Sequence, residues 1–275
     1  MRNIKTIIYF LFAAMLFAQI SITAQQKSLA EANLVVDSYS PQNDSVISIG
    51  VLINLKDDWH IYWKNPGDSG LPTDVEFSLP NGISASEIKF PIPKIFSSEE
   101  IINYGYSHQV LLISSLNIPK DYPQKDIFIS AKLTSLICKD LCKAFDTTLT
   151  ILLDLSKKYF AGKEISDLFN KTKKLLPQIN YNLKVTANSQ SDSVYVRLDK
   201  TDSLRLNLKS FEFYPYQAGV FKNKSHQVTV NKNNFLESVL ESDQFRISNP
   251  TELNGIIILN ENRDEAFEIN IPITY

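Results

Sequence analysis

The sequence predicts an all-β protein with a β-sandwich domain, a helical connector and a second β-rich domain. Between residues 34 and 155, short segments that alternate apolar and polar residues are separated by turn residues, which is typical of β-sandwiches. A segment with a helical period follows, and the alternation returns from residue 181. The composition agrees, because the chain of 275 residues has only 8 Gly and is rich in the β-branched and aromatic residues that strands favour.

Residues 1–24 are predicted to be an export signal. Arg2 and Lys5 precede an apolar run, and the small residue Ala24 ends a segment suited to cleavage. The apolar run of about 14 residues is short for a membrane span, and an uncleaved signal anchor is the alternative. We therefore expect a mature chain of about 250 residues outside the cytosol.

The length of the chain suggests two domains. We expect the first domain over residues 25–155, the helical connector over residues 156–180 and the second domain over residues 181–275. The formal net charge is −2 and charges of both signs are mixed along the chain, so the sequence has no basic footprint for nucleic acid.

In the first domain, alternation and turn residues define the expected strands. They are residues 35–37, 46–55, 75–79, 110–116, 127–137 and 147–155. The aromatic segment 59–63 precedes a loop over residues 65–70, and the segment around residues 101–106 carries loop signals.

The connector is predicted from a helical period, and the strands of the second domain are predicted from alternation. Ile165, Leu168, Phe169, Thr172 and Leu176 lie on one helical stripe, which Pro177 ends. The strands expected in the second domain are residues 183–186, 194–198, 204–208, 228–230, 255–260 and 267–272, with a helical turn over residues 236–240.

The only two cysteines, Cys138 and Cys142, fall between two expected strands with residues 139–141 as the turn. A disulfide that closes so short a loop adds little stability, whereas opposed residues of a hairpin lie close enough to bond with little movement. The pair is therefore suited to opening and closing. A passive surface disulfide is the alternative.

Charged neighbours bear on the reactivity of this pair. Lys139 and Lys143 would stabilise a thiolate if they approach it, and Asp140 would oppose this. A metal site needs further ligands, and the three histidines are too scattered to supply them.

Two other segments carry residues that could take part in chemistry. Residues 67–70 (GDSG) resemble the nucleophile segment of chymotrypsin-like proteases, but nothing around them suggests a protease, and a turn is the better interpretation. The rings of residues 59–63 and of residues 103–106 (NYGY) could exclude water from a reactive disulfide, or could merely pack in the core.

With these residues in view, the first domain resembles the periplasmic N-terminal domain of the DsbD family of thiol:disulfide interchange proteins, in the branch that includes ScsB-like proteins. The matching segments are residues 59–72 (WHIYWKNPGDSGLP), 103–106 (NYGY) and 137–143 (ICKDLCK). Residues 211–215 (FEFYP) resemble the region that follows this domain in that branch.

The resemblance implies an immunoglobulin-like β-sandwich in the periplasm whose cysteine pair relays electrons. It assigns Cys142 to the mixed disulfide with client proteins and Cys138 to its resolution. It also implies an aromatic cap near residues 101–106, with four residues shielding the pair. These are Tyr62, Asn103, Tyr104 and Tyr106.

The partners implied by the resemblance are a thioredoxin-like electron donor and periplasmic client thiol proteins, with cytochrome complex assembly among the processes it points to. No cofactor, metal or nucleic acid is implied. The chain ends at Tyr275 without a membrane bundle or a thioredoxin-like domain, so we expect another chain to supply the membrane electron carrier. Residues 143–145 (KAF) stand where the branch often has a proline after the second cysteine.

The sequence therefore supports two hypotheses. The first is a protein-disulfide reductase-like component that exchanges electrons through Cys138 and Cys142. The second is a non-catalytic secreted binding module in which the disulfide is passive.

Overall fold

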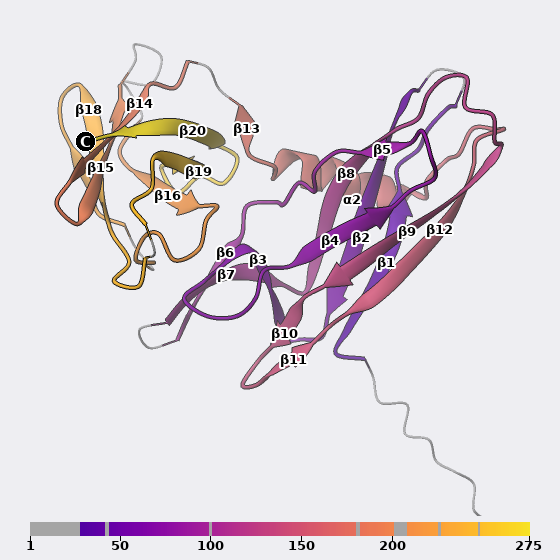
Figure 1. Cartoon of the computed structure of the whole chain (residues 1–275), viewed down its shortest axis with the longest axis horizontal. Helices are drawn as coiled ribbons and strands as arrows, with labels where there is room; N and C mark the ends of the chain where they lie inside the picture. Colours follow the sequence, from indigo (N-terminus) through magenta and orange to yellow (C-terminus); the bar gives the residue numbers. More distant parts are fainter. Residues whose placement is uncertain are drawn as a thin grey trace, which may run out of the picture.

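The structure of the protein is a computed structural model that describes residues 28–41, 44–98, 101–179, 182–200, 208–224, 227–246 and 248–275. The expected export signal and most of the expected strand 204–208 lie outside these ranges. The prediction of an all-β protein with one helical connector is confirmed (Figure 1). In the described ranges, no helix has both the length and the apolar character that a membrane crossing requires.

The first domain is a β-sandwich built from three sheets. Their strand orders are β1-β2-β8-β5, β12-β9-β4 and β11-β10-β3-β7-β6. The strands are β1 (Ala30–Val36), β2 (Val46–Leu55), β3 (His60–Gly67), β4 (Asp74–Ser78), β5 (Ser84–Ala85), β6 (Lys94–Ser98), β7 (Ile101–Ser107), β8 (Gln109–Asn117), β9 (Asp126–Thr134), β10 (Leu136–Cys138), β11 (Cys142–Ala144) and β12 (Thr147–Asp154).

The core of this sandwich follows from the alternation of its strands. Ile49 and Ile53 of β2 pack with Leu112 of β8 and with Ile129 and Leu133 of β9. Apolar side chains two residues apart lie on one face of a strand, so each sheet turns an apolar face inward. This buried core is the rigid support for the shorter strands that carry the cysteines.

Helix α2 (Lys163–Lys174) covers the outer face of the first sheet. Its Phe169 is fully buried against Leu52 of β2 and against Leu111 and Ile113 of β8. With both faces covered, β2 and β8 are buried along most of their length. The connector thus belongs to the packed structure of the first domain.

The second domain is a single curled sheet in the described part of the chain, ordered β16-β19-β20-β14-β15-β18-β17, with β13 pairing β20. Its strands are β13 (Gln178–Ile179), β14 (Val185–Gln190), β15 (Ser193–Asp199), β16 (Phe211–Pro215), β17 (Thr229–Asn231), β18 (Phe235–Glu241), β19 (Glu252–Leu259) and β20 (Ala266–Thr274). Phe211 and Phe213 are fully buried in its core.

Three expectations about local structure were wrong. The loop expected over residues 65–70 starts later, because strand β3 extends to Gly67. The helical turn expected over residues 236–240 is strand β18, because Leu236 and Leu240 alternate inward with the partner strands β15 and β17. The loop signals around residues 101–106 lie within strand β7, which pairs with β3 on one side and β6 on the other.

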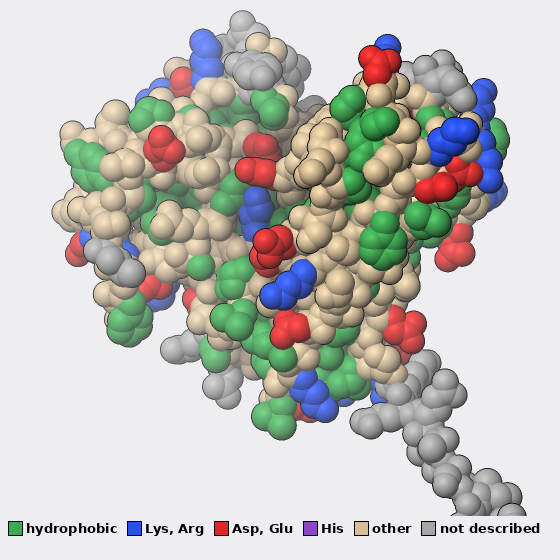
Figure 2. Space-filling model, turned by 45° about the vertical axis from the view of Figure 1, so that its right-hand side comes forward, with side chains coloured by type: hydrophobic (Ala, Val, Ile, Leu, Met, Phe, Trp, Pro, Cys, Tyr) green, Lys and Arg blue, Asp and Glu red, His purple; other side chains and the backbone are tan. Residues whose placement is uncertain are grey.

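The two domains share one apolar core where they meet. Tyr214, Ile256 and Ile258 of the second domain belong to the same buried cluster as Trp63 and Tyr104 of the first. Figure 1 shows β3, β6 and β7 on the side of the first domain that faces the second. Acidic and basic side chains are mixed over the face shown in Figure 2, which agrees with the small net charge.

Polar contacts secure the same junction. The buried Asn65 donates from Nδ2 to the carbonyl of Pro215 over 2.8 Å. Arg263 donates to the carbonyls of Ile92 and Pro93. Buried polar groups are costly unless paired, so these bonds fix the orientation of the second domain against strand β3 and the segment before β6.

Candidate functional site

Cys138 and Cys142 form a disulfide at the tip of the β10–β11 hairpin, with an S–S distance of 2.03 Å and a Cα–Cα distance of 4.1 Å. The two residues lie directly opposite each other in the strand register. Strand β9 runs into β10 and β11 runs into β12, and β9 pairs with β12 along its length. The disulfide therefore lies at the end of a long hairpin whose strands β9 and β12 are paired along their length.

The cysteines occupy a non-hydrogen-bonded position of this hairpin. The amide of Phe145 donates to the carbonyl of Ser135 over 2.8 Å, which makes these residues a hydrogen-bonded pair. Such pairs alternate along an antiparallel ladder, so Lys143 and Ile137 form the next one and the cysteines lie in between. Non-hydrogen-bonded pairs bring Cα atoms closer, as the disulfide requires.

The two sulfur-bearing residues differ in exposure. Cys138 is 2% exposed, because β10 lies between β11 and β3. Cys142 is exposed on β11, the terminal strand of the sheet. Cys142 is therefore the member of the pair at the protein surface, and Cys138 is covered by the protein.

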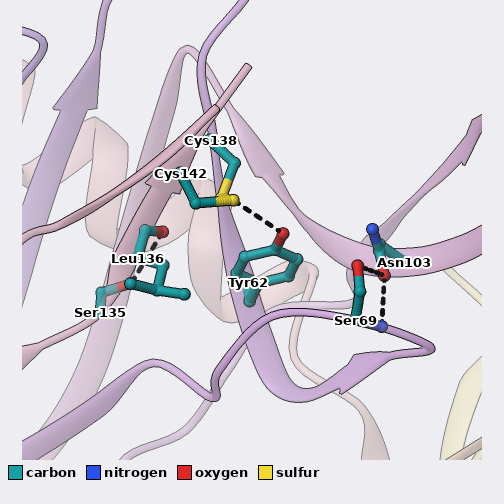
Figure 3. Close-up of a disulfide and its surroundings, with 7 residues drawn as sticks. All are labelled: Tyr62, Ser69, Asn103, Ser135, Leu136, Cys138 and Cys142. Atoms are coloured by element: carbon teal, nitrogen blue, oxygen red, sulfur yellow. Dashed lines mark hydrogen bonds between the residues drawn. A yellow bond between two sulfur atoms is a disulfide. The ribbon is translucent and has the colours of Figure 1, made fainter. Parts of the chain in front are cut away.

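Tyr62 reaches the exposed sulfur. Its hydroxyl lies 3.7 Å from Sγ of Cys142 (Figure 3). A disulfide sulfur carries no hydrogen, so the tyrosine is the donor. Burial raises the pKa of the Tyr62 hydroxyl, which keeps its proton available at neutral pH. The sequence expectation that Tyr62 lies close to the pair agrees with this placement.

A glycine turn packs against the ring of Tyr62. Gly70 has φ +93°, and a Cβ on it would lie 2.3 Å from the Tyr62 ring. The turn is tied to β7, because Ser69 donates from both its amide and its hydroxyl to Oδ1 of Asn103, each over 3.1 Å (Figure 3). The segment 67–70 is thus a turn that supports Tyr62, and Asn103 holds it in place.

The same turn is bonded to β7 and to the second domain through Asp68. Its amide donates to the carbonyl of Ile102 over 2.8 Å, and its Oδ2 accepts the amide of Ile102 over 2.7 Å. Its Oδ1 accepts Nδ2 of Asn223 in the second domain over 2.8 Å. The support beneath Tyr62 therefore includes both domains.

Tyr104 and Tyr106 lie on the other face of the sheet. In the register, Gly105 is opposite Tyr62 and Tyr106 is opposite Ile61. Side chains alternate along a strand, so Tyr104 and Tyr106 share the face of Ile61, opposite to the face of Tyr62. The structure therefore does not bring these two rings to the side of the disulfide.

Both tyrosines are instead buried at the junction of the domains. The Tyr104 ring packs edge-on against Trp63, with centroids 6.1 Å apart, and against Tyr214 of the second domain, 5.4 Å apart. The Tyr106 hydroxyl donates to the carbonyl of Pro91 over 2.5 Å. Burial raises the pKa of both hydroxyls.

Two rings on the disulfide face were not anticipated as site residues. His60 is directly opposite Cys138 in the register and packs edge-on against Tyr62, with ring centroids 5.4 Å apart. Phe96 of β6 stacks on His60 with centroids 4.7 Å apart. The alternation of residues 59–63 could have revealed His60, which shares a strand face with Tyr62, but no local signal pointed to Phe96.

The charged neighbours of the cysteines have partners of their own. Lys139 forms an ion pair with Asp58, with Nζ 3.0 Å from Oδ2. Nζ of Lys143 lies 5.9 Å from the centroid of the Trp59 ring. Among the residues that the structure describes, no cluster of three His, Cys, Asp or Glu side chains could hold a metal ion.

Comparison with known proteins bears on both the cysteines and the fold. The family described as the N-terminal part of the thiol:disulfide interchange protein DsbD matches residues 25–154. The crystal structure of the N-terminal periplasmic domain of ScsB from Proteus mirabilis has a similar fold, with a TM-score of 0.63, 16% identity and coverage of 92% of this chain and 96% of that one. No protein with a curated description matches the sequence.

Proposed function

Residues 25–154 belong to the family of the DsbD N-terminal domain and form a thiol–disulfide exchange domain, and from this premise we propose that the chain relays electrons in the periplasm. Electrons would pass from a thioredoxin-like donor through Cys138 and Cys142 to client proteins. The observation that carries this proposal is the pairing of one exposed and one buried cysteine across a hairpin that holds them together.

The reduced pair would act in two steps. The Cys142 thiolate attacks a client disulfide, forming a mixed disulfide and releasing one client thiolate, which takes up a proton. The Cys138 thiolate then attacks Sγ of Cys142, which restores the disulfide and releases the second client thiolate. The client gains two electrons and the domain loses two, and a donor dithiol returns them by the reverse steps.

The exposure of the two cysteines supports this assignment of roles. A client can reach Cys142 at the edge of the sheet, whereas Cys138 is buried and lies directly opposite Cys142 in the hairpin. The Tyr62 hydroxyl would stabilise the Cys142 thiolate, because a hydrogen bond to the charged form lowers the pKa of a thiol. His60 and Phe96 would shield the inner side of the pair.

The partners follow from the chemistry. A domain that gives away two electrons per cycle needs a dithiol donor, and we propose a thioredoxin-like protein supplied in turn by a membrane electron carrier on another chain. The periplasm suits this role, because disulfides form and persist there. The Proteus mirabilis domain with the similar fold is itself described as periplasmic.

Two measurements test the proposal. We expect the purified protein to equilibrate with glutathione or thioredoxin buffers at a potential above about −300 mV, the range of labile disulfides. We expect Cys138→Ala to accumulate mixed disulfides with client proteins and Cys142→Ala to accumulate few. A potential far below this range, with no exchange with a thioredoxin-like protein, would identify a passive disulfide in a binding module.

A further inference from the structure

The turn over residues 67–70 is bonded to the second domain at its start. The side chain of the buried Asn65 donates from Nδ2 to the carbonyl of Pro215 over 2.8 Å, and its Oδ1 accepts the amide of Gly67 over 2.9 Å. One amide side chain therefore joins the first residue of the turn to the last residue of strand β16. Buried hydrogen bonds are costly to leave unmade, so the start of the turn is fixed relative to the second domain.

A second bond to the same domain lies one residue further along the turn. Oδ1 of Asp68 accepts Nδ2 of Asn223 over 2.8 Å, while its Oδ2 accepts the amide of Ile102 in β7 over 2.7 Å. Asn223 is held by its own domain, because the preceding Lys222 donates its amide to the carbonyl of Glu241 in β18 over 2.8 Å. Asp68 thus joins a fixed point of the second domain to the sheet that carries the disulfide.

The other end of the turn contacts the ring of Tyr62. A Cβ at Gly70 would lie 2.3 Å from that ring, so only a glycine lets the backbone of the turn come this close. His60 packs edge-on against the same ring, with centroids 5.4 Å apart, and Tyr62 is buried. Close-packed groups pass a displacement on to their neighbours. A shift of the turn would therefore shift the ring.

The position of this ring determines how the Tyr62 hydroxyl meets the exposed sulfur. The hydroxyl lies 3.7 Å from Sγ of Cys142, and hydrogen bonds weaken as their distance and angle depart from the optimum. A small movement of the ring would change how well the hydroxyl stabilises the Cys142 thiolate. A contact of this kind needs support from groups that are themselves held in place.

We propose that the second domain is a positioning element of the redox centre: through its bonds to Asn65 and Asp68 it holds the turn against Tyr62, and so directs the Tyr62 hydroxyl at Sγ of Cys142. Asn223 is a positioning residue, because it acts through Asp68 and the turn. This inference rests on the proposed function and gives the second domain a part in it, which is to adjust the reactivity of the attacking thiol.

A double-mutant cycle on the full chain tests this coupling. The pKa of the Cys142 thiol is measured from the pH dependence of iodoacetamide alkylation in the Cys138→Ala background. Four proteins are compared: that background, and the background with Asn223→Ala, with Tyr62→Phe and with both. If Asn223 acts through the Tyr62 hydroxyl, its removal should matter only while the hydroxyl is present.

We expect Asn223→Ala to raise the pKa of the thiol by about 0.5 pH unit and to slow its alkylation at neutral pH roughly threefold. In the Tyr62→Phe background it should change neither. Equal shifts in the two backgrounds, or no shift in either, would overturn the positioning role. If the unsubstituted protein nevertheless exchanges with a thioredoxin-like protein, only this inference fails. If it does not exchange, the proposed function fails as well.

Lys224→Ala is the matched control from the neighbouring position. It breaks an exposed ion pair with Glu241, whose two atoms are 2.7 Å apart and which lies within the second domain. We expect it to leave the pKa of the Cys142 thiol unchanged. A shift as large as that of Asn223→Ala would show that the effect does not depend on the bond to Asp68, and would contradict the proposal.

An exchange of the two bonded side chains provides a rescue. Asn223→Asp replaces the donor with a carboxylate that faces Asp68, so the bond is lost and like charges repel. Adding Asp68→Asn restores a donor and an acceptor, and the new amide oxygen can still accept the amide of Ile102. We expect Asn223→Asp to raise the pKa of the thiol at least as far as Asn223→Ala does, and the double variant, whose net charge is unchanged, to reverse most of the rise. A double variant shifted as far as Asn223→Asp alone would refute the positioning role.

Discussion

The hydroxyl of Tyr62 extends from β3 past β10 to lie 3.7 Å from Sγ of Cys142 on β11. It thus contacts the exposed cysteine, although Cys138 belongs to the nearer strand. The hydrogen bond is directed at the sulfur of Cys142, which is the attacking thiolate in the first step of the proposed mechanism. Tyr62 itself is 2% exposed, so the donor is fixed in place before any client arrives.

Tyr62→Phe should raise the pKa of the Cys142 thiol. The ring would stay in place, but the donor to the thiolate would be lost. Loss of a hydrogen bond of this kind to a charged group should raise the pKa of the thiol by about one pH unit and should slow its alkylation at neutral pH several-fold. The measurement is the pH dependence of iodoacetamide alkylation in the Cys138→Ala background. Tyr39→Phe is the control, because the Tyr39 hydroxyl donates to the carbonyl of Asp154, and its alkylation profile should not change.

Gly70→Ala should destabilise the protein by more than Gly219→Ala. Both glycines have positive φ, +93° and +68°, so an alanine costs about 1–2 kcal/mol at either position. Only at Gly70 would the new Cβ meet another group, the ring of Tyr62 at 2.3 Å, and such a clash adds about 1–3 kcal/mol. Urea denaturation of both variants measures the difference, and equal losses would show that the turn does not support Tyr62.

Asn65→Ala should weaken the junction of the domains. It leaves the carbonyl of Pro215 without its buried donor, which costs about 1–3 kcal/mol. The free energy of unfolding is measured by urea denaturation, followed through the fluorescence of the two tryptophans, of which Trp63 packs against Tyr216. Asn223→Ala is the matched control, since its bond to Asp68 is exposed and should contribute less. A loss at Asn223 as large as that at Asn65 would contradict the importance of burial here.

His60 should make stability depend on pH. Burial lowers the pKa of His60 in the folded protein below its value of about 6.5 in the unfolded chain. The unfolded state then binds more protons than the folded state below about pH 6.5. The free energy of unfolding should therefore fall as the pH drops from about 6.5 toward the folded pKa of His60, and the contribution of His60 should be constant above about pH 6.5.

Urea denaturation between about pH 5 and 7.5 measures this slope. His60→Phe keeps a ring to stack on Phe96 and should reduce the slope. His108→Asn is the control, because His108 is exposed, has φ 64°, and asparagine tolerates that conformation. A slope that persists in His60→Phe but disappears in His108→Asn would contradict this prediction and would assign the pH dependence to His108.

The elements that the sequence predicted well are those whose signal is local. Strand β2 has the expected bounds, because its alternation and flanking turns are complete within ten residues. The cysteine hairpin was also predictable, since a short spacer between two strand patterns leaves few ways to arrange the pair. The disulfide between Cys138 and Cys142 matches that expectation.

The parts that could not be predicted depend on distant pairing. The face on which Tyr104 and Tyr106 lie is set by the register of β7 with β3, where an irregularity follows Tyr62. Phe96 reaches the site only because β6 pairs with β7. For β18, apolar residues at positions 236 and 240 fit a helix as well as a strand, and only the neighbouring strands decide between them.

The ladder around the cysteines has one more consequence. The bond between Phe145 and Ser135, and the next one at Lys143 and Ile137, do not involve sulfur, so we expect them to persist when the disulfide opens. We therefore expect the oxidised and reduced forms to present nearly the same surface to a partner protein. In the proposed function, the shape of this hairpin would not distinguish a reducing partner from an oxidising one, so the redox potentials and abundances of the partners would set the net direction of electron transfer.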